Sequence, residues 1–435
     1  MEIKEKKKID IYFVANFILS ALIIFYFFYG FHINENSAGA GGYDHDFEKI
    51  WSNLILLKQD IFLNLNSLEY NDSRPPLSYI LHILLNPFID NPENFRLSNL
   101  FISLAVPVLL FYSIKQNYKY LSVDLVILYS LIITLSPYFR TTAYWSLGEN
   151  YGIIFLLLSC IIYKKVEKNL KNYTKYQIYF SILFLCFSSS LIVYFDQKLV
   201  FIPFLILYLI YCLKITISQK FCALLFFFIF ALPYFYLMYL WEGIIPPSAI
   251  EGRGVGSKLH LFNPGYCLSI AAIAIFPFIL AKKNEYKNLR EKILSKKNLI
   301  ILFSFSIYIF FALEFGNFEN LRTDGKGAIH KLFLLLFENT KIRLFFTIII
   351  FYCSLIFLLF IFNKRKDQLI IFFLAFTSLF IFPFYQEYLD PLLYVLIFSF
   401  FSTRFSINDP KFVYIIFFYY SLFSFTTKYY YKIFI

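Results

Sequence analysis

Three acidic side chains crowd one short segment near the N-terminus: Asp44, Asp46 and Glu48. Neighbouring carboxylates repel one another, and this raises the pKa of at least one of them unless cations lie near. A carboxylate with a raised pKa suits general-base catalysis. An Asp-x-Asp pair could equally hold a divalent cation through its oxygens. The plain structural alternative is a solvated acidic loop, in which Asp44 or Asp46 caps a helix that begins near Phe47. The residues alone leave these three interpretations open.

A second candidate is Arg74, which stands directly before the double proline Pro75-Pro76. Its guanidinium could bind a phosphate or a carboxylate through two parallel hydrogen bonds. The prolines also suit the first turn of a helix, so a rigid helix start explains the motif without any chemistry.

Four isolated charges lie beside long apolar runs and form the next candidates. Arg140 and Glu149 stand in the aromatic segment 137–150, and Asp196 and Lys198 stand in the short turn 194–198. Charges this close to a bilayer are costly, which makes them functional candidates by default. For the turn, mutual neutralisation of Asp196 and Lys198 is an equally simple explanation.

The glycine-rich segment 251–258 carries Arg253 and Lys258. It is not a P-loop, because its spacing misses G-x-x-x-x-G-K and no strand precedes it. A flexible loop is the plain interpretation, although backbone N–H groups together with Arg253 and Lys258 could hold a phosphate. The last polar candidate is Gln386, in a segment that interrupts an apolar stretch.

The elements that must position these residues are apolar helices. Of the 435 residues, 59% are hydrophobic and 16% charged, whereas about 25% are charged in a typical soluble domain. Apolar runs of the length that a bilayer requires recur along the chain without two-residue alternation, which favours helices over a barrel. We therefore predict an all-α, polytopic membrane protein with about thirteen spans (11 to 14). The predicted spans are 10–30, 96–114, 120–136, 150–163, 178–194, 198–213, 220–240, 266–281, 298–314, 344–363, 368–384, 386–402 and 411–425.

The charge pattern predicts the topology. Four lysines within residues 1–8 favour a cytoplasmic N-terminus, and the predicted inner loop 282–297 holds seven Lys or Arg against two Glu. The first apolar run is too long for a signal peptide and is interpreted as an uncleaved anchor. The net charge of +12 therefore reports membrane topology, and a nucleic-acid partner is not expected. The six cysteines form no CxxC motif, so neither a disulfide framework nor a zinc site is indicated.

The predicted outer side is more acidic. Residues 31–95 form a long first outer loop with nine Asp or Glu against three Lys or Arg. Within it, residues 75–89 are apolar but too short to span, which predicts an amphipathic juxtamembrane helix. Further outer loops are expected at 137–149, 195–197, 241–265 and 315–343. We divide the chain into an N-terminal module, 1–215, which carries the expected site, and a C-terminal module, 216–435.

Together these motifs resemble the GT-C superfamily of multi-span glycosyltransferases, which use polyprenyl-phosphate sugars as donors. The nearest resemblance is to the alpha-1,2-glucosyltransferase family that completes dolichol-linked oligosaccharides, and to its bacterial relatives. The matching segments cover most of the chain. They are the acidic motif Asp44–Glu48, Arg74-Pro75-Pro76-Leu77-Ser78-Tyr79, Arg96-Leu97-Ser98-Asn99, Trp241-x-Gly243, Leu259-His260 and Gln386-x-Tyr388-x-Asp390-Pro391. The turn Asp196-Gln197-Lys198 departs from the Arg-Gln that is frequent in the family.

The resemblance implies an inverting glycosyltransferase with a GT-C-like fold that acts on the outer face of the membrane. Its partners would be a polyprenyl-phosphate sugar donor, a glycan, lipid or protein acceptor, and membrane lipids. Asp46 is the expected general base, with Asp44 next. No cofactor is required, although a Mg or Mn ion on Asp44 and Asp46 fits the motif. The substrate-binding candidates are Glu48, Arg74, Arg140, Glu149, Asp196, Lys198, Arg253, Lys258, His260 and Gln386.

Alternatives of other classes remain. A transporter or flippase would place charges near mid-span and contain structural repeats, whereas the charges here crowd the ends of the runs. An O-antigen polymerase or ligase would place its large outer loop late in the chain, whereas the longest loop here comes first. The expected location is the bacterial inner membrane, or the endoplasmic reticulum membrane in a eukaryote.

Overall fold

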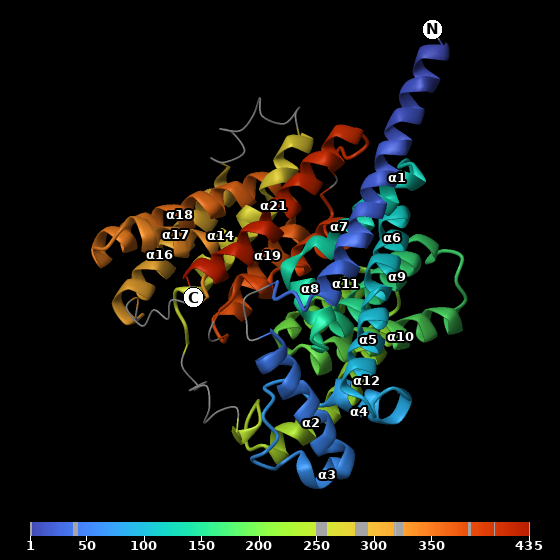
Figure 1. Ribbon diagram of the computed structural model, residues 1–435, viewed down its shortest axis with the longest axis vertical. Coiled ribbons are helices and arrows are strands. Elements are labelled where there is room, and N and C mark those ends of the chain that lie inside the picture. Colours follow the sequence, from blue (N-terminus) through green and yellow to red (C-terminus); the bar gives the residue numbers. More distant parts are fainter. Residues whose placement is uncertain are drawn as a thin grey trace. The chain divides into compact units, whose positions relative to one another are not determined.

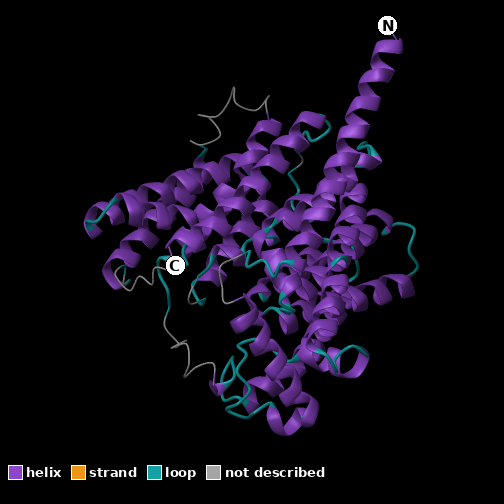
Figure 2. Ribbon diagram, in the orientation of Figure 1, coloured by secondary structure: helices purple, strands orange, loops and turns teal. Residues whose placement is uncertain are grey.

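The computed structural model describes residues 2–37, 42–248, 259–282, 295–316, 318, 325–381, 384–403 and 405–434. Every regular element in these segments is a helix, as predicted (Figure 2). The candidate residues Arg253 and Lys258 lie outside the described residues.

Seven described helices are long and apolar enough to cross a membrane. A helix pair bent by 71°, Val123–Leu135 with Pro137–Tyr144, makes an eighth if it is one span. A hydrocarbon core of about 30 Å needs about 20 helical residues, and only helices or closed barrels satisfy their backbone there. The chain is therefore an all-helical integral membrane protein with several spans. The seven are Ile11–His32, Pro92–Asn117, Lys175–Phe195, Ile217–Leu240, Asn263–Leu280, Lys296–Phe315 and Thr340–Ile361.

The five other predicted spans form helices that do not meet this standard of length and apolarity. Charged residues crowd the last turns of the helix that contains 150–163, and tyrosine, serine and threonine dilute the one that contains 411–425. The remaining three regions hold regular helices of only 12, 14 and 8 residues: Phe201–Cys212, Arg365–Ser378 and Leu392–Ser399. Apolar composition alone therefore overstated the length of continuous helix.

The chain forms two compact units. Unit 1 comprises Met1–Gly256 with Tyr420–Ile435, and unit 2 comprises Ser257–Tyr419. This division differs from the predicted modules 1–215 and 216–435. The reason is local, because α12 (Ile217–Leu240) packs along α10 (Lys175–Phe195) and so continues unit 1 beyond residue 215.

Unit 1 is a bundle of long helices (Figure 1). The helix α9 lies between α6 and α10, and α7 packs against both α1 and α6. Leucine and isoleucine side chains such as Leu110, Leu156 and Ile202 are fully buried between them. The remaining elements are α1 (Glu2–His32), η1 (Tyr43–Phe47), α2 (Glu48–Gln59), α3 (Ile61–Asn64), α4 (Leu77–Leu85), α5 (Pro92–Ser103), α6 (Ala105–Asn117), α7 (Val123–Ile132), η2 (Ile133–Leu135), α8 (Pro137–Tyr144), α9 (Glu149–Asn169), η3 (Gln197–Leu199) and α11 (Phe201–Cys212).

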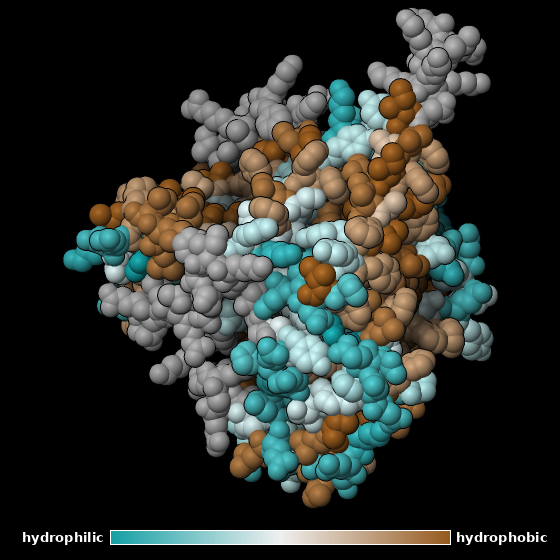
Figure 3. All heavy atoms as spheres, viewed as in Figure 1, coloured by the Kyte–Doolittle hydropathy of each residue, from teal (hydrophilic) through white to brown (hydrophobic). Residues whose placement is uncertain are grey.

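One end of unit 1 is polar and is built mainly from the first predicted outer loop. The helix α2 packs against α4, which is the helix predicted within residues 75–89. The exposed leucines Leu84 and Leu85 give α4 an apolar outer face. Figure 3 shows hydrophilic atoms gathered around α2 and hydrophobic atoms along α1. An amphipathic helix beside the ends of apolar spans suits the membrane surface.

Unit 2 is arranged around α14 (Asn263–Ile275), most of which is buried (Figure 1). The helices α17, α18, α19 and α20 pack against it, and α16 packs on α18. Gly265 lets α14 approach α18 closely, because a Cβ at this position would lie 2.2 Å from the ring of Phe351 on α18. The further elements are η4 (Phe276–Lys282), α16 (Lys296–Phe315), α17 (Gly327–Leu336), α18 (Thr340–Ile361), α19 (Arg365–Ser378), η6 (Gln386–Tyr388) and α20 (Leu392–Ser399), and α21 (Pro410–Phe434) contributes residues to both units.

Candidate functional site

Four separate segments of unit 1 meet around Arg74. They are η1 with Asp46, the loop before α4, the first turn of α9 with Glu149, and the turn between α10 and α11. Each charge has a local reason for its position. Glu149 begins a helix, where the helix dipole favours a carboxylate. Asp196 caps η3 by accepting a hydrogen bond from the Lys198 N–H at 3.1 Å.

Arg74 forms the centre of the site by binding two carboxylates. Its Nε and Nη2 lie 2.8 and 2.7 Å from Oε1 of Glu149, and its Nη1 lies 3.2 Å from Oδ1 of Asp72. Asp72 is fully buried and also accepts hydrogen bonds from the Arg74 N–H and from the Tyr79 hydroxyl at 2.6 Å. This network fixes the direction of the Arg74 side chain, because its partners come from two different elements.

Glu149 receives further donors on the same oxygen. The Tyr138 hydroxyl donates to Oε1 at 2.6 Å, and the Lys198 ammonium lies 3.7 Å from it. Lys198 also lies 3.5 Å from Asp196. Arg74, Glu149, Asp196 and Lys198, which the sequence selects one by one, therefore lie in one cluster. Their role in substrate binding stays a prediction.

Two buried carboxylate oxygens in this site have no hydrogen-bond partner among the residues that the structure describes: Oδ2 of Asp46 and Oε2 of Glu149. Unpartnered buried polar atoms are rare in native proteins and call for an explanation, such as a bound ion, water or ligand. Asp46 is close enough to Arg74 and Glu149 for both charges to act on its pKa. A ligand that brings a hydrogen-bond donor, such as a hydroxyl group, to either of these two oxygens would therefore gain a hydrogen bond.

The electrostatics separate the carboxylates into two kinds. Burial raises the pKa of Asp46, with Glu149 adding to the rise and Arg74 opposing it. Burial likewise raises the pKa of Asp196. For Glu149 burial acts in the same direction, but the Arg74 and Lys198 charges outweigh it and hold the pKa below its usual value. Asp46 and Asp196 are therefore prepared to accept a proton, and Glu149 is prepared to stay charged.

A bridging side chain, Gln197, holds the two halves of the site together. Its amide donates to the Ser73 carbonyl at 2.8 Å, and its carbonyl accepts from the Tyr234 hydroxyl at 3.1 Å. The Arg74 loop is thereby fastened to the turn that carries Asp196 and Lys198, and to α12.

Sequence reasoning missed four contributors to this site: Asp72, Tyr79, Tyr138 and Gln197. Each stands near a predicted site residue in the chain. Tyr79 and Gln197 were noted only as parts of motifs, and a tyrosine such as Tyr138 carries little signal in so aromatic a sequence. For Asp72, the spacing of two residues before Arg74 would have been informative, since an Asp side chain commonly bonds the backbone two residues on.

The acidic motif divides by exposure to solvent. Asp44 and Glu48 are exposed, while Asp46 is half-buried. Among the described residues no three His, Cys, Asp or Glu side chains are grouped as a metal site would need. A divalent cation on Asp44 and Asp46 stays a prediction.

Arg140 belongs to a different cluster, in which it is fully buried. Its Nη2 lies 3.0 Å from Oε2 of Glu35, its Nε donates to the Tyr144 hydroxyl at 2.9 Å, and its guanidinium lies 3.9 Å from the centre of the Tyr26 ring. Its neighbour in the aromatic segment, Glu149, is engaged with Arg74 instead. A charge that is buried with its own carboxylate is explained by structure alone.

The last two candidates, His260 and Gln386, lie in unit 2, and each forms a hydrogen bond with a backbone group of that unit. The His260 N–H donates to the Leu379 carbonyl at 2.8 Å. The Gln386 side chain accepts a hydrogen bond from the Ala328 N–H at 2.9 Å and so caps the start of α17.

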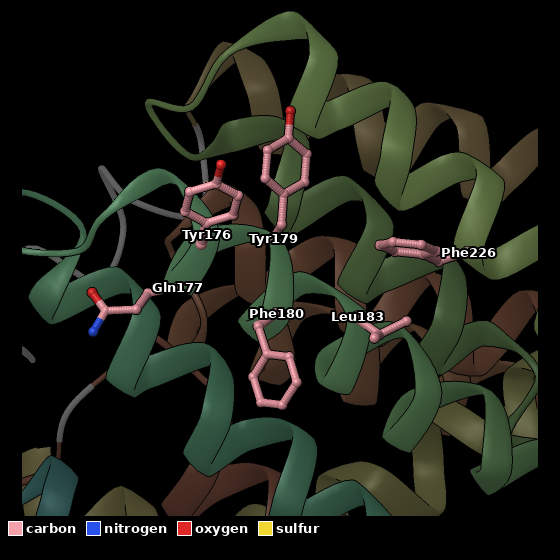
Figure 4. Close-up of a pocket in the computed structure, with 6 residues that line it drawn as sticks. All are labelled: Tyr176, Gln177, Tyr179, Phe180, Leu183 and Phe226. Atoms are coloured by element: carbon pink, nitrogen blue, oxygen red, sulfur yellow. The ribbon is translucent and has the colours of Figure 1, made fainter.

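A surface pocket of about 490 Å³ lies in unit 1 (Figure 4). It is lined by Tyr176, Gln177, Tyr179, Phe180, Leu183 and Phe226, and none of them belongs to the Arg74 cluster. Its lining from α10 and α12 is almost entirely apolar, which suits contact with lipid chains rather than chemistry.

The fold and the site define a class: an integral membrane protein of several helical spans, with a buried cluster of carboxylates, arginine and lysine in one compact unit. No protein-family model, no curated protein and no solved structure matches the chain.

Proposed function

We propose that the protein is a membrane glycosyltransferase that transfers a sugar from a polyprenyl-phosphate donor to a glycan, lipid or protein acceptor. The observation that carries this proposal is the Arg74 cluster, in which two cations converge on Glu149 while Asp46 and Glu149 each keep an unpartnered buried oxygen. Cations for a phosphate and a carboxylate for a proton are the two groups that such a transfer needs.

The donor determines where the site must be. A polyprenyl-phosphate sugar partitions into the bilayer, so its phosphate reaches protein only near the membrane surface. The cluster lies beside the amphipathic helix α4 and at the ends of α9 and α10, which supports such a location. On this proposal the cluster faces the outer, periplasmic or luminal, side, and the N-terminus is cytoplasmic.

The reaction would be a single in-line displacement. Asp46 takes the proton of the acceptor hydroxyl while the acceptor oxygen bonds to the anomeric carbon. The bond from that carbon to the phosphate oxygen breaks, and its electron pair leaves with the polyprenyl phosphate. One such displacement inverts the anomeric carbon. Arg74 and Lys198 stabilise the charge that develops on the leaving phosphate.

The charges already present in the site limit how a phosphate can bind. Both cations are already paired with carboxylates, Glu149 and Asp196 among them. An entering phosphate must therefore share Arg74 and Lys198 with Glu149, which would turn the free oxygen of Glu149 toward acceptor hydroxyls. Burial raises the pKa of Asp196, so this carboxylate can lose its negative charge more easily than an exposed one when a phosphate enters.

The finer features of the fold form part of the same proposal. We propose a GT-C-like architecture, with about thirteen spans once the shorter helices of both units are counted as broken or tilted crossings. The expected membrane is the bacterial inner membrane, or the endoplasmic reticulum membrane in a eukaryote.

The test compares cell-surface and lipid-linked glycans by mass spectrometry in cells with and without the gene. Restoring the wild-type gene should return the missing sugar, and Asp46→Asn should fail to do so although it is inserted at the normal level. Asp90→Asn provides a matched control, because Asp90 lies in the same predicted loop but is exposed and pairs with Lys58 instead. Identical glycans with and without the gene would contradict the proposal, and would favour a transporter of another substrate.

A further inference from the structure

The pocket in Figure 4 lies where two membrane-spanning helices begin side by side. Most of its lining comes from the first turns of α10, which starts at Lys175, and the rest is Phe226 on α12, which starts at Ile217. Near these starts the Tyr179 hydroxyl lies 2.9 Å from the Ser218 hydroxyl. Both helices are long and apolar enough to cross a membrane. The pocket therefore opens to the bilayer close to one membrane surface.

The lining of this pocket suits a hydrocarbon chain. Aromatic rings and one leucine form nearly all of it, and Tyr176 and Phe180 are 85% and 60% exposed. Lipid chains are as apolar as leucine, so a chain that enters the pocket gains packing contacts but no hydrophobic energy. Selection of one lipid over another must then come from its headgroup.

A lysine stands above the pocket on the same face of α10. Residues four apart share a helix face, so Lys175, Tyr179 and Leu183 form one stripe. Tyr179 and Leu183 line the pocket, and Lys175 continues their stripe to the start of the helix. Lys175 is exposed, and it pairs with no carboxylate among the described residues. Its flexible stem can keep the ammonium at the level of the lipid headgroups.

The chain around the start of α10 is basic. Residues 164–175 contain five lysines and one glutamate. Some of this charge is already engaged, because Lys164 pairs with Glu167 at 2.8 Å and the Lys168 ammonium donates to the Gln116 carbonyl at 2.7 Å. The lysine excess predicts a cytoplasmic side, and the cytoplasmic leaflet carries anionic lipids. The charge at this end of the pocket is therefore complementary to an anionic headgroup.

We propose that the pocket holds one acyl chain of an anionic phospholipid from the cytoplasmic leaflet, and that the lipid phosphate contacts Lys175. The helix α10 has 21 residues and is thus about 30 Å long, and its far end leads into the turn of Asp196. The lipid site and the Arg74 cluster therefore lie at opposite ends of one span, and the lipid site does not depend on the proposed glycosyltransferase activity. Lipid bound there would hold the starts of α10 and α12 at the membrane surface.

The first test measures lipid binding to the purified full-length protein by native mass spectrometry. Phosphatidylglycerol should bind about fivefold more tightly than phosphatidylcholine with the same acyl chains, as expected for one lysine at an anionic surface. Lys175→Gln should abolish this preference and leave phosphatidylcholine binding unchanged. Lys296→Gln is the matched control, because Lys296 is also the exposed first residue of a membrane span, but its helix α16 does not line the pocket. Equal binding of the two lipids by the wild type would overturn the proposal, as would equal losses in Lys175→Gln and Lys296→Gln.

The second test fills the pocket. Leu183→Trp should weaken binding of both lipids, because the larger side chain takes the place of the acyl chain. Leu224→Trp is its control, since Leu224 is 46% exposed on α12 but does not line the pocket. Circular dichroism checks that both variants keep their helices. Unchanged lipid binding in Leu183→Trp would overturn the proposal. So would a dimer without bound lipid that Leu183→Trp separates, because the pocket would then hold a second copy of the chain.

Discussion

The ion pair between Arg74 and Glu149 makes the strongest quantitative prediction. Both side chains are mostly removed from solvent, at 23% and 4% exposed, and two Arg74 nitrogens lie within 2.8 Å of one Glu149 oxygen. Removing one partner of a buried pair leaves an uncompensated charge, which costs about 3–5 kcal/mol. Arg74 keeps Asp72 when Glu149 is removed, and Glu149 keeps Lys198 when Arg74 is removed. Loss of Arg74 also removes the ion pair of Asp72, but this effect is the same in Arg74→Gln and in the double variant and cancels in the coupling energy.

We therefore expect values at the lower end of that range. Glu149→Gln and Arg74→Gln should each lower the free energy of unfolding by about 3 kcal/mol. The double variant leaves neither charge of this pair unpaired, so it should cost about 3–4 kcal/mol rather than the sum of about 6. The coupling energy is then about 2–3 kcal/mol.

The assay is reversible unfolding of the purified protein in mixed detergent, followed by circular dichroism for all four members of the cycle. The pair Lys58 and Asp90 supplies a control cycle, because its 2.7 Å contact is as short but its side chains are 41% and 82% exposed. Its coupling should stay below about 1 kcal/mol. Additive effects of the Arg74 and Glu149 changes, with a coupling no larger than in the control, would contradict this account of the buried pair.

Two further predictions follow from pKa and packing. Burial raises the pKa of Asp46 above 3.8, so sugar transfer should fall as the pH drops through that raised pKa. Asp72 and Glu149 have lowered pKa values in the folded protein, so they stabilise the fold at any pH above the usual pKa of a carboxyl group. Thermal stability should therefore persist at the pH where transfer is lost. Simultaneous loss of both on acidification would argue against Asp46 as the base. Gly265→Ala should lower the free energy of unfolding by about 1–3 kcal/mol, because the new Cβ would lie 2.2 Å from the Phe351 ring. Gly148→Ala is the control, because the nearest atom to its new Cβ is the Ser78 hydroxyl at 3.3 Å. This control should lower the free energy of unfolding by less in the same assay.

The fold class was predictable because membrane helices carry a strong signal in composition. Long apolar runs leave few alternatives once the backbone must bond to itself. The number of spans was less accessible, because the same runs also form short helices that break and bend. The helix pair around Ser136 illustrates this: Ser136 caps a new helix and Pro137 begins it, so the axis turns by 71° within one apolar stretch.

The candidate site was predictable where a charge had no other reason to be in an apolar chain. Arg74, Glu149, Asp196 and Lys198 stand out on that ground and share one cluster. The same reasoning also selects Arg140, whose partner Glu35 lies 105 positions away in the chain. Sequence shows that a buried charge needs a partner but not which one, because the choice depends on tertiary contacts.

The unpartnered oxygens of Asp46 and Glu149 were beyond sequence reasoning, and they connect the structure to the proposed chemistry. Glu149 takes its donors on Oε1, and no described residue donates to its Oε2. A carboxylate with only a structural role would be expected to satisfy both oxygens, since each unmet buried acceptor costs about 1–3 kcal/mol. A site that binds hydroxyl groups of a sugar must instead keep acceptors unsatisfied until the ligand arrives. The cost in the free protein is then recovered on binding, which favours ligands that bring a hydroxyl to that position.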